Sequence, residues 1–376
     1  MTLEPALTVN YAGGAGSYPV YIGRGMLERL PEIAAYHCPG RRIAVIADTR
    51  VAACVPSPLD APVVTFPPGE GSKSREQWSR LTDHLLELGL GRDSAIVALG
   101  GGVTGDLAGF VAATYHRGLP LVQVPTSLLA MVDASIGGKT GVDTPAGKNM
   151  VGAFHHPVAV VMDPAVLGTL PRDGLRTGLA EAIKHAVIAD AEHFAWLRAN
   201  LSQLLARDID ALDRLIRVSA AIKAAIVEED ERETGRRATL NAGHTVGHAI
   251  EAATEWRVPH GEAVAIGLVV EADVAERLGI AALGTAVALR EIVGAAGLPA
   301  SLPRGLAPES VLEAARRDKK NRRGAIRCAL PARVGVIASI ATEERKDGRT
   351  EGLASWTTAV PEDVLLAALE ANRERG

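Results

Sequence analysis

Short apolar runs and amphipathic segments alternate through the first half of the chain. Runs rich in β-branched residues, such as Arg42 to Ile46 and Ala95 to Leu99, predict buried strands, whereas Arg75 to Leu88 repeats its large apolar residues at helical spacing. This alternation predicts an α/β fold with a mostly parallel sheet, whose ligands bind beyond the carboxyl ends of the strands. Other expected strands are Leu7 to Asn10, Tyr18 to Ile22, Ala61 to Phe66 and Leu121 to Val124.

The strand pattern fades near residue 163, and long helical patterns follow. We therefore expect two domains, an α/β domain over residues 1–163 and a mainly α-helical domain over residues 164–376. Val264 to Ala275 is apolar nearly all round, which predicts a central, buried helix. Ile326 to Leu330 and Val334 to Ala338 are candidates for a small hairpin, and the polar tail after Ala341 predicts no clear element.

A row of polar residues marks the segment from Arg237 to Glu255. We expect one helix there, because the polar positions recur at steps of three and four residues, which stack on one face. The row is Arg237, Asn241, His244, His248, Glu251 and Glu255, and the apolar row beside it is Ala242, Val246, Ala249 and Ala253. Gly243 and Gly247 would let another backbone approach this helix closely.

Histidines concentrate in the same segment. His244 and His248 lie one helical turn apart, a spacing that suits a divalent transition metal, and His260 in the triplet His-Gly-Glu offers a third imidazole. The alternative is that these histidines cap helix ends or bond backbone groups in a core. Three of them within one short segment favour a site.

Composition excludes some classes of function. A chain of 376 residues with a formal net charge of −4, 3% aromatic residues and no basic run lacks the charge and the stacking surfaces that nucleic-acid binding uses. The amino terminus has no secretion-signal pattern, and the longest apolar run, Ala263 to Val270, is too short to span a membrane. Cys38, Cys54 and Cys328 form no CxxC pair, so we expect reduced thiols and a cytoplasmic protein.

A glycine motif follows one of the expected strands. Gly100, Gly102 and Gly105 satisfy G-x-G-x-x-G between a strand and a helix, where backbone amides and the helix dipole can hold a pyrophosphate. The motif does not follow the first strand, and the next strand ends without the acidic residue that usually binds the ribose. Asp48, at the end of an earlier strand, is the better candidate. The alternative is a tight glycine turn with a purely structural use.

The stretch from Asp133 to Asn149 is dense in glycine and cations. Its glycines let the backbone approach an anion, and Lys139 and Lys148 supply positive charge. A strict P-loop is excluded, because Asp133 stands where that motif requires glycine. Arg117 is a further candidate for a phosphate, although an exposed arginine on a loop is usually just solvated.

Charged residues also interrupt the helical patterns of the second half. Glu181 and Lys184 lie on one helix flank and could be a surface pair. Lys223 interrupts an apolar row, so its ammonium group must either reach solvent or meet a negative partner, and we favour the partner.

The motifs GGGVTGDLAGF, PTSLLAMVDASIGGKTGVDTPAGKNMVGAF, AEAIKH, LNAGHTVGHAIE, HGEAVAIG and DKK occur together in this order. With them, the chain resembles the 3-dehydroquinate synthase family of sugar phosphate cyclases from about Pro68 to Lys320. The resemblance implies an NAD-binding, Rossmann-like α/β domain and a helical metal domain with the active site in the cleft. It also implies a homodimer that uses zinc or cobalt.

The resemblance further implies a set of site residues. The metal ligands would be Glu181, His244 and His260, with His248 serving the substrate phosphate and proton transfers. Other substrate contacts would be Arg117, Asp133, Lys139, Asn149, Lys184, Lys223, Arg237, Asn241 and one of Lys319 or Lys320. NAD contacts would be Asp48, Gly69, Glu70, Lys73, Gly102, Val103, Thr104, Gly105, Asp106, Thr126, Ser127, Lys139, Lys148 and Thr169. The chain departs from the family pattern at Pro68, Ser127, Asp143, Val246 and His185-Ala186, none of which removes a ligand or a cation.

The resemblance implies a phosphate-eliminating lyase of EC class 4.2.3.4. It would convert 3-deoxy-D-arabino-heptulosonate 7-phosphate into 3-dehydroquinate in the shikimate pathway of aromatic amino acid and chorismate biosynthesis. Three alternatives remain: a related cyclase acting on sedoheptulose 7-phosphate or on an amino analogue, an NAD-dependent polyol dehydrogenase, and a binding module without catalysis.

Overall fold

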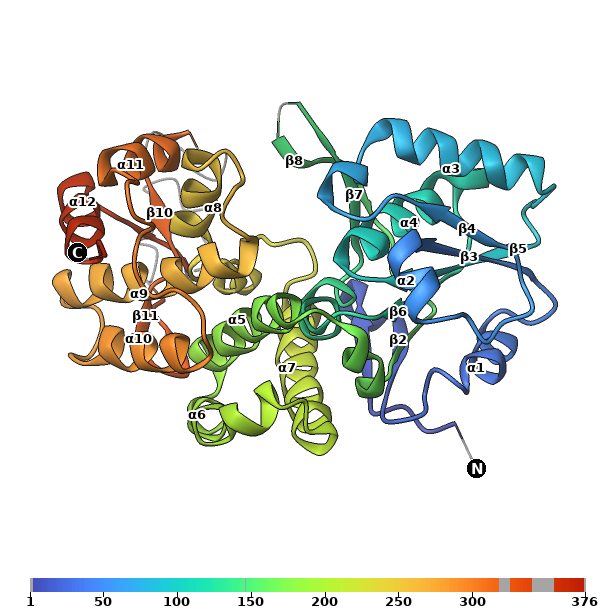
Figure 1. The fold of residues 1–376 in the computed structure, drawn as a ribbon, viewed down its shortest axis with the longest axis horizontal. Helices are drawn as coiled ribbons and strands as arrows, with labels where there is room; N and C mark the ends of the chain where they lie inside the picture. The colour runs from blue at the N-terminus through green and yellow to red at the C-terminus, as the bar shows by residue number, and fades with distance from the viewer. Residues whose placement is uncertain (1–2, 146, 318–324, 340–354, 375–376) are drawn as a thin grey trace, which may run out of the picture. The chain divides into compact units, whose positions relative to one another are not determined.

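The computed structural model describes residues 3–145, 147–317, 325–339 and 355–374. These form two compact units: Met1–Leu175 with Arg207–Glu228, and Arg176–Ala206 with Glu229–Gly376. Each unit is a part of the chain whose residues contact one another. That the chain has two domains with a boundary near residue 163 stays a prediction. The fold class is confirmed, since a mostly parallel sheet occupies the first unit and helices dominate the second (Figure 1).

The helices are α1 Leu30–His37, α2 Thr49–Cys54, α3 Arg75–Glu87, α4 Gly102–Thr114, α5 Arg172–Ala189, α6 Ala191–Leu205, α7 Ile209–Glu229, α8 His244–Ala253, α9 His260–Arg277, α10 Thr285–Ala295, α11 Pro308–Arg316 and α12 Glu362–Ala371. The strands are β1 Leu7–Tyr11, β2 Gly16–Ile22, β3 Arg42–Asp48, β4 Val63–Phe66, β5 Ser94–Gly100, β6 Leu121–Pro125, β7 Lys139–Thr144, β8 Gly147–Phe154, β9 Ala159–Met162, β10 Arg327–Cys328, β11 Pro331–Arg333, β12 Val336–Ile337 and β13 Thr358–Ala359. No described helix is both long and apolar enough to cross a membrane.

The main sheet has the strand order β1-β2-β9-β6-β5-β3-β4, and only the β1–β2 pair is antiparallel. Successive residues of β3 and β5 face opposite sides. Ile46 and Ile96 pack under α3 and α4, whereas Val45 and Val97 pack toward α1. Both faces are therefore buried, which explains why these strands appear in the sequence as continuous apolar runs.

The chain changes direction between β3 and β5, which are neighbours in the sheet. After β3 it continues to β4 on one side, and after β5 it continues to β6 on the other. In open parallel sheets, such a switch point opens a crevice at the carboxyl ends of the two strands. Here those ends are Asp48 and Gly100.

The stretch from Asp133 to Asn149, for which the sequence suggested no strand, forms part of a separate hairpin of β7 and β8. The hairpin lies against α4 in Figure 1. At the contact, a Cβ added to Gly109 would come within 2.5 Å of the Thr140 side chain. The amide of Asp143 also donates to the Lys73 carbonyl at 2.7 Å, which ties the hairpin to the loop before α3.

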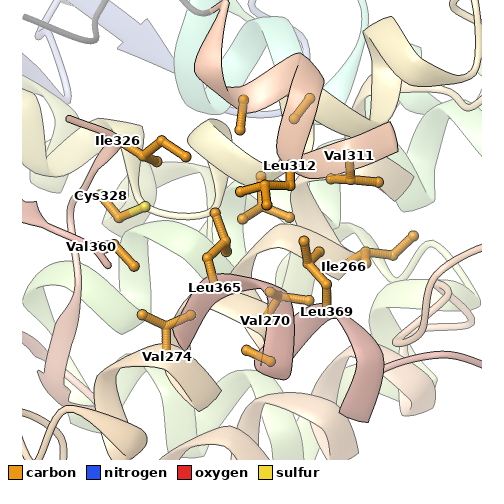
Figure 2. Packing of buried hydrophobic residues seen from close by; sticks show 14 of the residues in the cluster. Ile266, Val270, Val274, Val311, Leu312, Ile326, Cys328, Val360, Leu365 and Leu369 are labelled. Carbon is orange, nitrogen blue, oxygen red and sulfur yellow. The ribbon is translucent and has the colours of Figure 1, made fainter. Parts of the chain in front are cut away.

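The core of the second unit joins helices from distant parts of the sequence. Figure 2 shows Val270 and Val274 of α9, Val311 and Leu312 of α11, and Leu365 and Leu369 of α12 gathered in one apolar cluster. The expectation that Val264 to Ala275 is central is confirmed. Helix α12 lies in the tail for which the sequence predicted no element, and its buried leucines explain why it forms.

Two sequence expectations need correction in this unit. Arg327–Cys328 pairs with Thr358–Ala359, and Pro331–Arg333 pairs with Val336–Ile337, so the expected hairpin has different partners. The segment from Arg237 to Glu255 is not one helix. A 3-10 helix, Arg236–Asn241, ends before Gly243, which has a φ of 76°, and α8 starts at His244. The break therefore leaves Arg237 and Asn241 outside α8.

Candidate metal and cofactor sites

Helix α5 carries a buried ion pair in the second unit. Nζ of Lys184 lies 2.5 Å from Oε2 of Glu181, and both side chains are 1% exposed. The residues are three positions apart, so they lie on the same face of the helix. The surface pair considered from the sequence is therefore wrong. A buried carboxylate of this kind requires compensation, and Lys184 supplies positive charge beside one of its two oxygens.

The other oxygen of Glu181 faces two imidazoles. Nε2 of His244 lies 3.6 Å from Oε1 of Glu181, and Nε2 of His260 lies 3.5 Å from the same atom. His244 is the first residue of α8, and His260 is the first residue of α9. Three segments that are distant in the sequence therefore bring one carboxylate oxygen and two ring nitrogens together.

Hydrogen bonds set the orientation of both imidazole rings. Nδ1 of His244 lies 3.2 Å from the carbonyl oxygen of Ala242, and Nδ1 of His260 lies 3.2 Å from Oε2 of Glu251. Both partners are acceptors, so each Nδ1 carries the hydrogen and each Nε2 faces Glu181. Metal-binding histidines show this same pattern, in which the nitrogen away from the ion donates to an oxygen.

The donor set fits a divalent transition metal. The ligand atoms of Glu181, His244 and His260 all lie within 4.8 Å of one another. Four-coordinate zinc binds nitrogen and oxygen at about 2.0–2.2 Å, which places neighbouring ligand atoms roughly 3.4 Å apart. The separations of 3.5 and 3.6 Å between the histidines and Glu181 match that spacing. One carboxylate and two imidazoles would leave positions on the metal open for substrate oxygens.

The electrostatics of the two histidines differ. Burial lowers the pKa of His244 well below its ordinary value, Glu181 opposes this shift, and Lys184 adds to it. Burial also disfavours a charge on His260, but hydrogen bonds to Glu181 and Glu251 outweigh it and raise the pKa to about 9. His244 is thus neutral, the form that binds a metal, and without a metal His260 supplies the positive charge beside Glu181.

His248 lies beside this group. Its ring centroid is 5.3 Å from that of His244 and 6.0 Å from that of His260. A second set of close ligand atoms, His248, Glu251 and His260, overlaps the first. In that set the Glu251 oxygen contacts Nδ1 of His260, the nitrogen away from Glu181. The set with Glu181 therefore suits a metal better, and His248 is positioned to contact a ligand beside it.

Two further expected substrate residues, Arg237 and Asn241, lie in the 3-10 segment before α8. Nη1 of the buried Arg237 donates to the carbonyl of Glu231, and Nδ2 of Asn241 donates to Oε1 of Glu233 at 2.6 Å. Oδ2 of Asp230 accepts from the Arg237 amide at 2.9 Å. These bonds fix the segment without using α8. Lys319 and Lys320 lie outside the described residues.

In the first unit, most of the expected NAD residues lie at one edge of the main sheet, whereas Lys139 and Lys148 lie on the β7–β8 hairpin. Asp48 ends β3, Gly69 and Glu70 follow β4, Gly102 to Asp106 follow β5, Thr126 and Ser127 follow β6, and Thr169 ends the 3-10 turn after β9. All these strands are parallel, so their carboxyl ends share that edge. Ligands of doubly wound sheets bind at this edge.

The glycines of the motif allow close packing, and the helix that follows them starts without a side-chain cap. A Cβ on Gly100 would lie 2.2 Å from Oγ1 of Thr104, and one on Gly105 would lie 2.9 Å from Oε1 of Gln123. The N-cap of α4 is Gly101, which makes no side-chain cap. The first amides of α4 and the positive end of its helix dipole therefore lie at the carboxyl end of β5, an arrangement that binds phosphate groups.

Lys73 and Asp106 form a second ion pair beside this motif, at 2.6 Å. Burial would lower the pKa of Lys73, but Asp106 and Glu70 outweigh it and raise the pKa. Asp48 caps α2, because its Oδ1 accepts from the Val51 amide at 2.8 Å. These residues stiffen the loops that surround the switch point.

The expected substrate residues of the first unit lie in three places. Nζ of Lys223, on α7, lies 2.5 Å from Oδ1 of Asp133, so the predicted negative partner of Lys223 is present. Lys139 begins β7, and Asn149 lies on β8 with a φ of 54°; both are exposed. Arg117 is exposed, with a φ of 69°, in the turn after α4.

The structure adds residues that sequence reasoning did not assign. Glu271 is a carboxylate within the apolar stretch of α9 and is 1% exposed, which is a signal that the sequence contained. Asp143 accepts from the Asn149 amide at 2.7 Å and so holds its left-handed backbone. Such contacts depend on tertiary packing.

Comparison with known proteins shows which family the chain belongs to. A family model for the 3-dehydroquinate synthase N-terminal region matches residues 63–177, and one for the C-terminal region matches residues 178–321. The chain belongs to the 3-dehydroquinate synthase family. A relative named 3-dehydroquinate synthase from Symbiobacterium thermophilum is 47% identical over 335 residues, which cover 86% of this chain and 94% of the relative. Another, from Methylococcus capsulatus, is 46% identical over 336 residues, which cover 87% of this chain and 93% of the relative.

Solved structures agree with membership of the 3-dehydroquinate synthase family. 2-Deoxy-scyllo-inosose synthase, complexed with carbaglucose-6-phosphate, NAD+ and Co2+, superposes with a TM-score of 0.84 at 25% identity, over 97% of this chain and 99% of that one. 2-epi-5-epi-Valiolone synthase from Streptomyces hygroscopicus, with NAD+ and Zn2+ bound, gives 0.82 at 27% identity, over 96% and 98%. A probable glycerol dehydrogenase from Sinorhizobium meliloti, at 19% identity and a TM-score of 0.64, shares the fold.

Proposed function

We propose that this chain is a 3-dehydroquinate synthase. It converts 3-deoxy-D-arabino-heptulosonate 7-phosphate into 3-dehydroquinate and phosphate, in the shikimate pathway to aromatic amino acids. The observation that carries this proposal is the convergence of Glu181, His244 and His260, with both Nδ1 atoms held by acceptors, in a chain whose relatives of that name are 43–47% identical.

Two cofactors belong to the proposal. Glu181, His244 and His260 hold a divalent metal, Zn2+ or Co2+, and the edge of the sheet from Asp48 to the first turn of α4 holds NAD. Bound together, NAD accepts and returns a hydride and the metal polarises the substrate hydroxyl that is oxidised. The two solved cyclases described above carry NAD+ with Co2+ or Zn2+, which supports both assignments.

The chain's own residues hold the two anionic ends of the substrate. Lys139, Lys223 and Arg237 supply positive charge to a protein whose net charge is −4. Asp133 orients the Lys223 ammonium group through their ion pair. His248 holds the leaving phosphate beside the metal group, and this phosphate accepts the proton that elimination removes.

Phosphate release tests this function directly. The purified chain is incubated with heptulosonate phosphate, NAD and Co2+ or Zn2+, and phosphate, absorbance of NADH and product mass are followed. We expect phosphate and 3-dehydroquinate to appear together without accumulation of NADH, and we expect a chelator to stop the reaction. Net NADH production would instead identify a polyol dehydrogenase, and no turnover with a bound metal would favour a binding module.

The related cyclases are the second candidate, because the two solved cyclases above superpose over nearly the whole chain. The higher identity of the 3-dehydroquinate synthases argues for the heptulosonate. Sedoheptulose 7-phosphate, which lacks the carboxylate, is the matched competitor. Faster phosphate release from that sugar would reassign the substrate.

We also propose that the enzyme acts as a homodimer in the cytoplasm. The family resemblance supports the dimer, and a reducing compartment suits cysteines that are present as thiols, of which Cys54 is exposed. Light scattering of the purified chain measures the assembly, and a monomeric mass at working concentration would contradict it.

A further inference from the structure

Helices α8 and α9 pack closely, in opposite directions. A Cβ added to Gly267 would lie 1.9 Å from the carbonyl oxygen of Gly243, and one added to Gly247 would lie 3.1 Å from that of Ala263. Gly243 thus faces Gly267, whereas Gly247 faces Ala263. Residue numbers rise along α8 where they fall along α9, so the two helices are antiparallel. Each helix begins with one histidine of the candidate metal group, and these starts lie at opposite ends of the pair.

At one end of the pair, α8 supports the histidine of α9. Glu251 lies near the end of α8 and is 2% exposed, and its Oε2 accepts from Nδ1 of His260 at 3.2 Å. This bond sets the rotation of the His260 ring and leaves Nε2 facing Glu181. A carboxylate in this position also makes the imidazole a stronger ligand.

At the other end, α9 supports the histidine of α8. Glu271 is 1% exposed, and its two oxygens accept from the amides of Gly243 and Val246, at 2.7 and 3.1 Å. The amide of Val246 is one of those that the start of a helix leaves without an internal partner. Glu271 therefore caps α8 from another helix and stabilises the left-handed turn at Gly243, directly before His244.

We propose that Glu251 and Glu271 are reciprocal positioning residues of the metal site. Each helix of the α8–α9 pair holds the histidine of the other, through the ring of His260 in one case and through the backbone before His244 in the other. The inference rests on the proposed metal group. Two buried carboxylates are costly unless hydrogen bonds satisfy them, and these bonds connect both carboxylates to the same candidate site.

Binding of Co2+ alone tests the proposal without the reaction. The metal-free chain is titrated against a competing chelator to obtain the dissociation constant, and the visible absorption spectrum of bound Co2+ reports the ligand geometry. We expect Glu251→Ala and Glu271→Ala each to weaken Co2+ binding by about 10–100-fold, the usual effect of removing a group that supports a metal ligand through a hydrogen bond. Both spectra should shift relative to the unaltered chain.

The amide variants separate the two roles. In Glu251→Gln, the side-chain carbonyl can still accept from Nδ1 of His260, so we expect a smaller loss than in Glu251→Ala. In Glu271→Gln, one amide group faces two backbone donors and can accept from only one of them, so we expect a loss close to that of Glu271→Ala. Where Glu271→Ala does not fold, Glu271→Asp keeps the charge but shortens the reach, and its Co2+ spectrum should still shift.

Glu276→Gln is the matched control. Glu276 also lies on α9 and accepts from a helix-start amide, that of Ala286 in α10, at 2.8 Å, and among the described residues it makes no hydrogen bond or ion pair with a histidine. We expect this variant to bind Co2+ like the unaltered chain. Affinities and spectra of the Glu251 and Glu271 variants that match those of Glu276→Gln would overturn the inference. Failure of the unaltered chain to bind Co2+ would overturn the metal group itself, and the inference with it.

Discussion

Lys184 and Glu181 form an ion pair of 2.5 Å in which each side chain is 1% exposed. Neither charge can be solvated, so each depends on the other or on a replacement. Glu181 also faces His244 and His260 with its second oxygen, so a divalent cation bound there would compensate the same carboxylate. The ion pair therefore couples the stability of the metal-free chain to the metal site.

Lys184→Met should expose this coupling. It leaves the Glu181 carboxylate buried with less compensation, so the free energy of unfolding of the metal-free chain should fall by about 3–5 kcal/mol. Added Zn2+ should restore part of the loss, since the ion supplies positive charge. Urea unfolding with and without Zn2+ measures both values, and the double variant Glu181→Gln with Lys184→Met is the neutral control. An equal loss in the free energy of unfolding with and without Zn2+ would contradict the coupling.

Single histidine variants should separate ligands from a substrate residue. His244→Ala and His260→Ala should each reduce Zn2+ affinity by more than the roughly 100-fold that loss of an outer partner can cause. His248→Ala should keep its zinc and instead slow phosphate elimination. Metal analysis after dialysis, together with phosphate release, measures both effects. Loss of zinc from His248→Ala would show that His248 is a ligand.

Gly243 combines a left-handed backbone with close packing. Gly243→Ala would place a Cβ 2.7 Å from Cγ of Leu268, at a φ of 76°. We expect a loss of about 2–5 kcal/mol in the free energy of unfolding, from about 1–2 for the backbone and about 1–3 for overpacking. Gly279→Ala is the control, because Gly279 has a φ of 68° with nothing within 4 Å. In urea unfolding, Gly279→Ala should lose only the backbone part of the free energy of unfolding. Equal losses in Gly243→Ala and Gly279→Ala would refute the packing role of Gly243.

Gly101 caps α4 without a side chain, at φ −75° and ψ −170°, which any residue adopts. Gly101→Asp should therefore leave stability unchanged or raise it slightly, by a few tenths of a kcal/mol. Its carboxylate would repel the proposed pyrophosphate, so NAD affinity should fall by about tenfold or more. Gly101→Asn has the same shape without the charge and should retain more affinity. Calorimetric titration with NAD measures this, and equal affinities of the two variants would argue against pyrophosphate at α4.

Asp230 should produce a pH-dependent contribution to stability. Partial burial would raise the pKa of its carboxyl, but hydrogen bonds from the amides of Thr234, Gly235 and Arg237 outweigh it and lower the pKa. The contribution is therefore complete above the unfolded pKa of about 3.9 and is lost as the pH falls through the lower folded pKa.

Asp230→Ala measures that contribution. The variant should lower the free energy of unfolding by about 1–3 kcal/mol at neutral pH, since it leaves backbone donors without their carboxylate. The difference from the unaltered chain should stay constant down to about pH 5 and shrink below about pH 4. Denaturant unfolding across this range tests the sign, and a difference that grows on acidification would contradict it.

Some features of this protein could be predicted from local pattern. Val264 to Ala275 is apolar on nearly all sides, and a helix of that kind can be stable only in a core, where it is found. The β-branched runs around Val45 and Val97 likewise required a sheet covered on both faces. The spacing of Gly100, Gly102 and Gly105 indicated a strand, a turn and a helix, because few other structures need those glycines.

The segment from Arg237 to Glu255 shows where local pattern failed. Its polar spacing fits one helix, and nothing within it opposes that reading except Gly243. The break is stabilised by Glu271, which lies on another helix and supplies both oxygens to the backbone around Gly243. A periodicity argument contains no information about a hydrogen-bond partner so far along the chain.

The sequence by itself determined the fold class, the positions of most strands and helices, and the histidines that could form a site, because backbone sterics and apolar burial act over a few neighbouring residues. Only the tertiary structure decided that one oxygen of Glu181 meets His244 and His260, that Lys184 pairs with the other oxygen, and that Glu251 and Glu271 bond His260 and the backbone before His244. These contacts join separate helices, and they form because buried charges must find partners that only chain packing can bring to them.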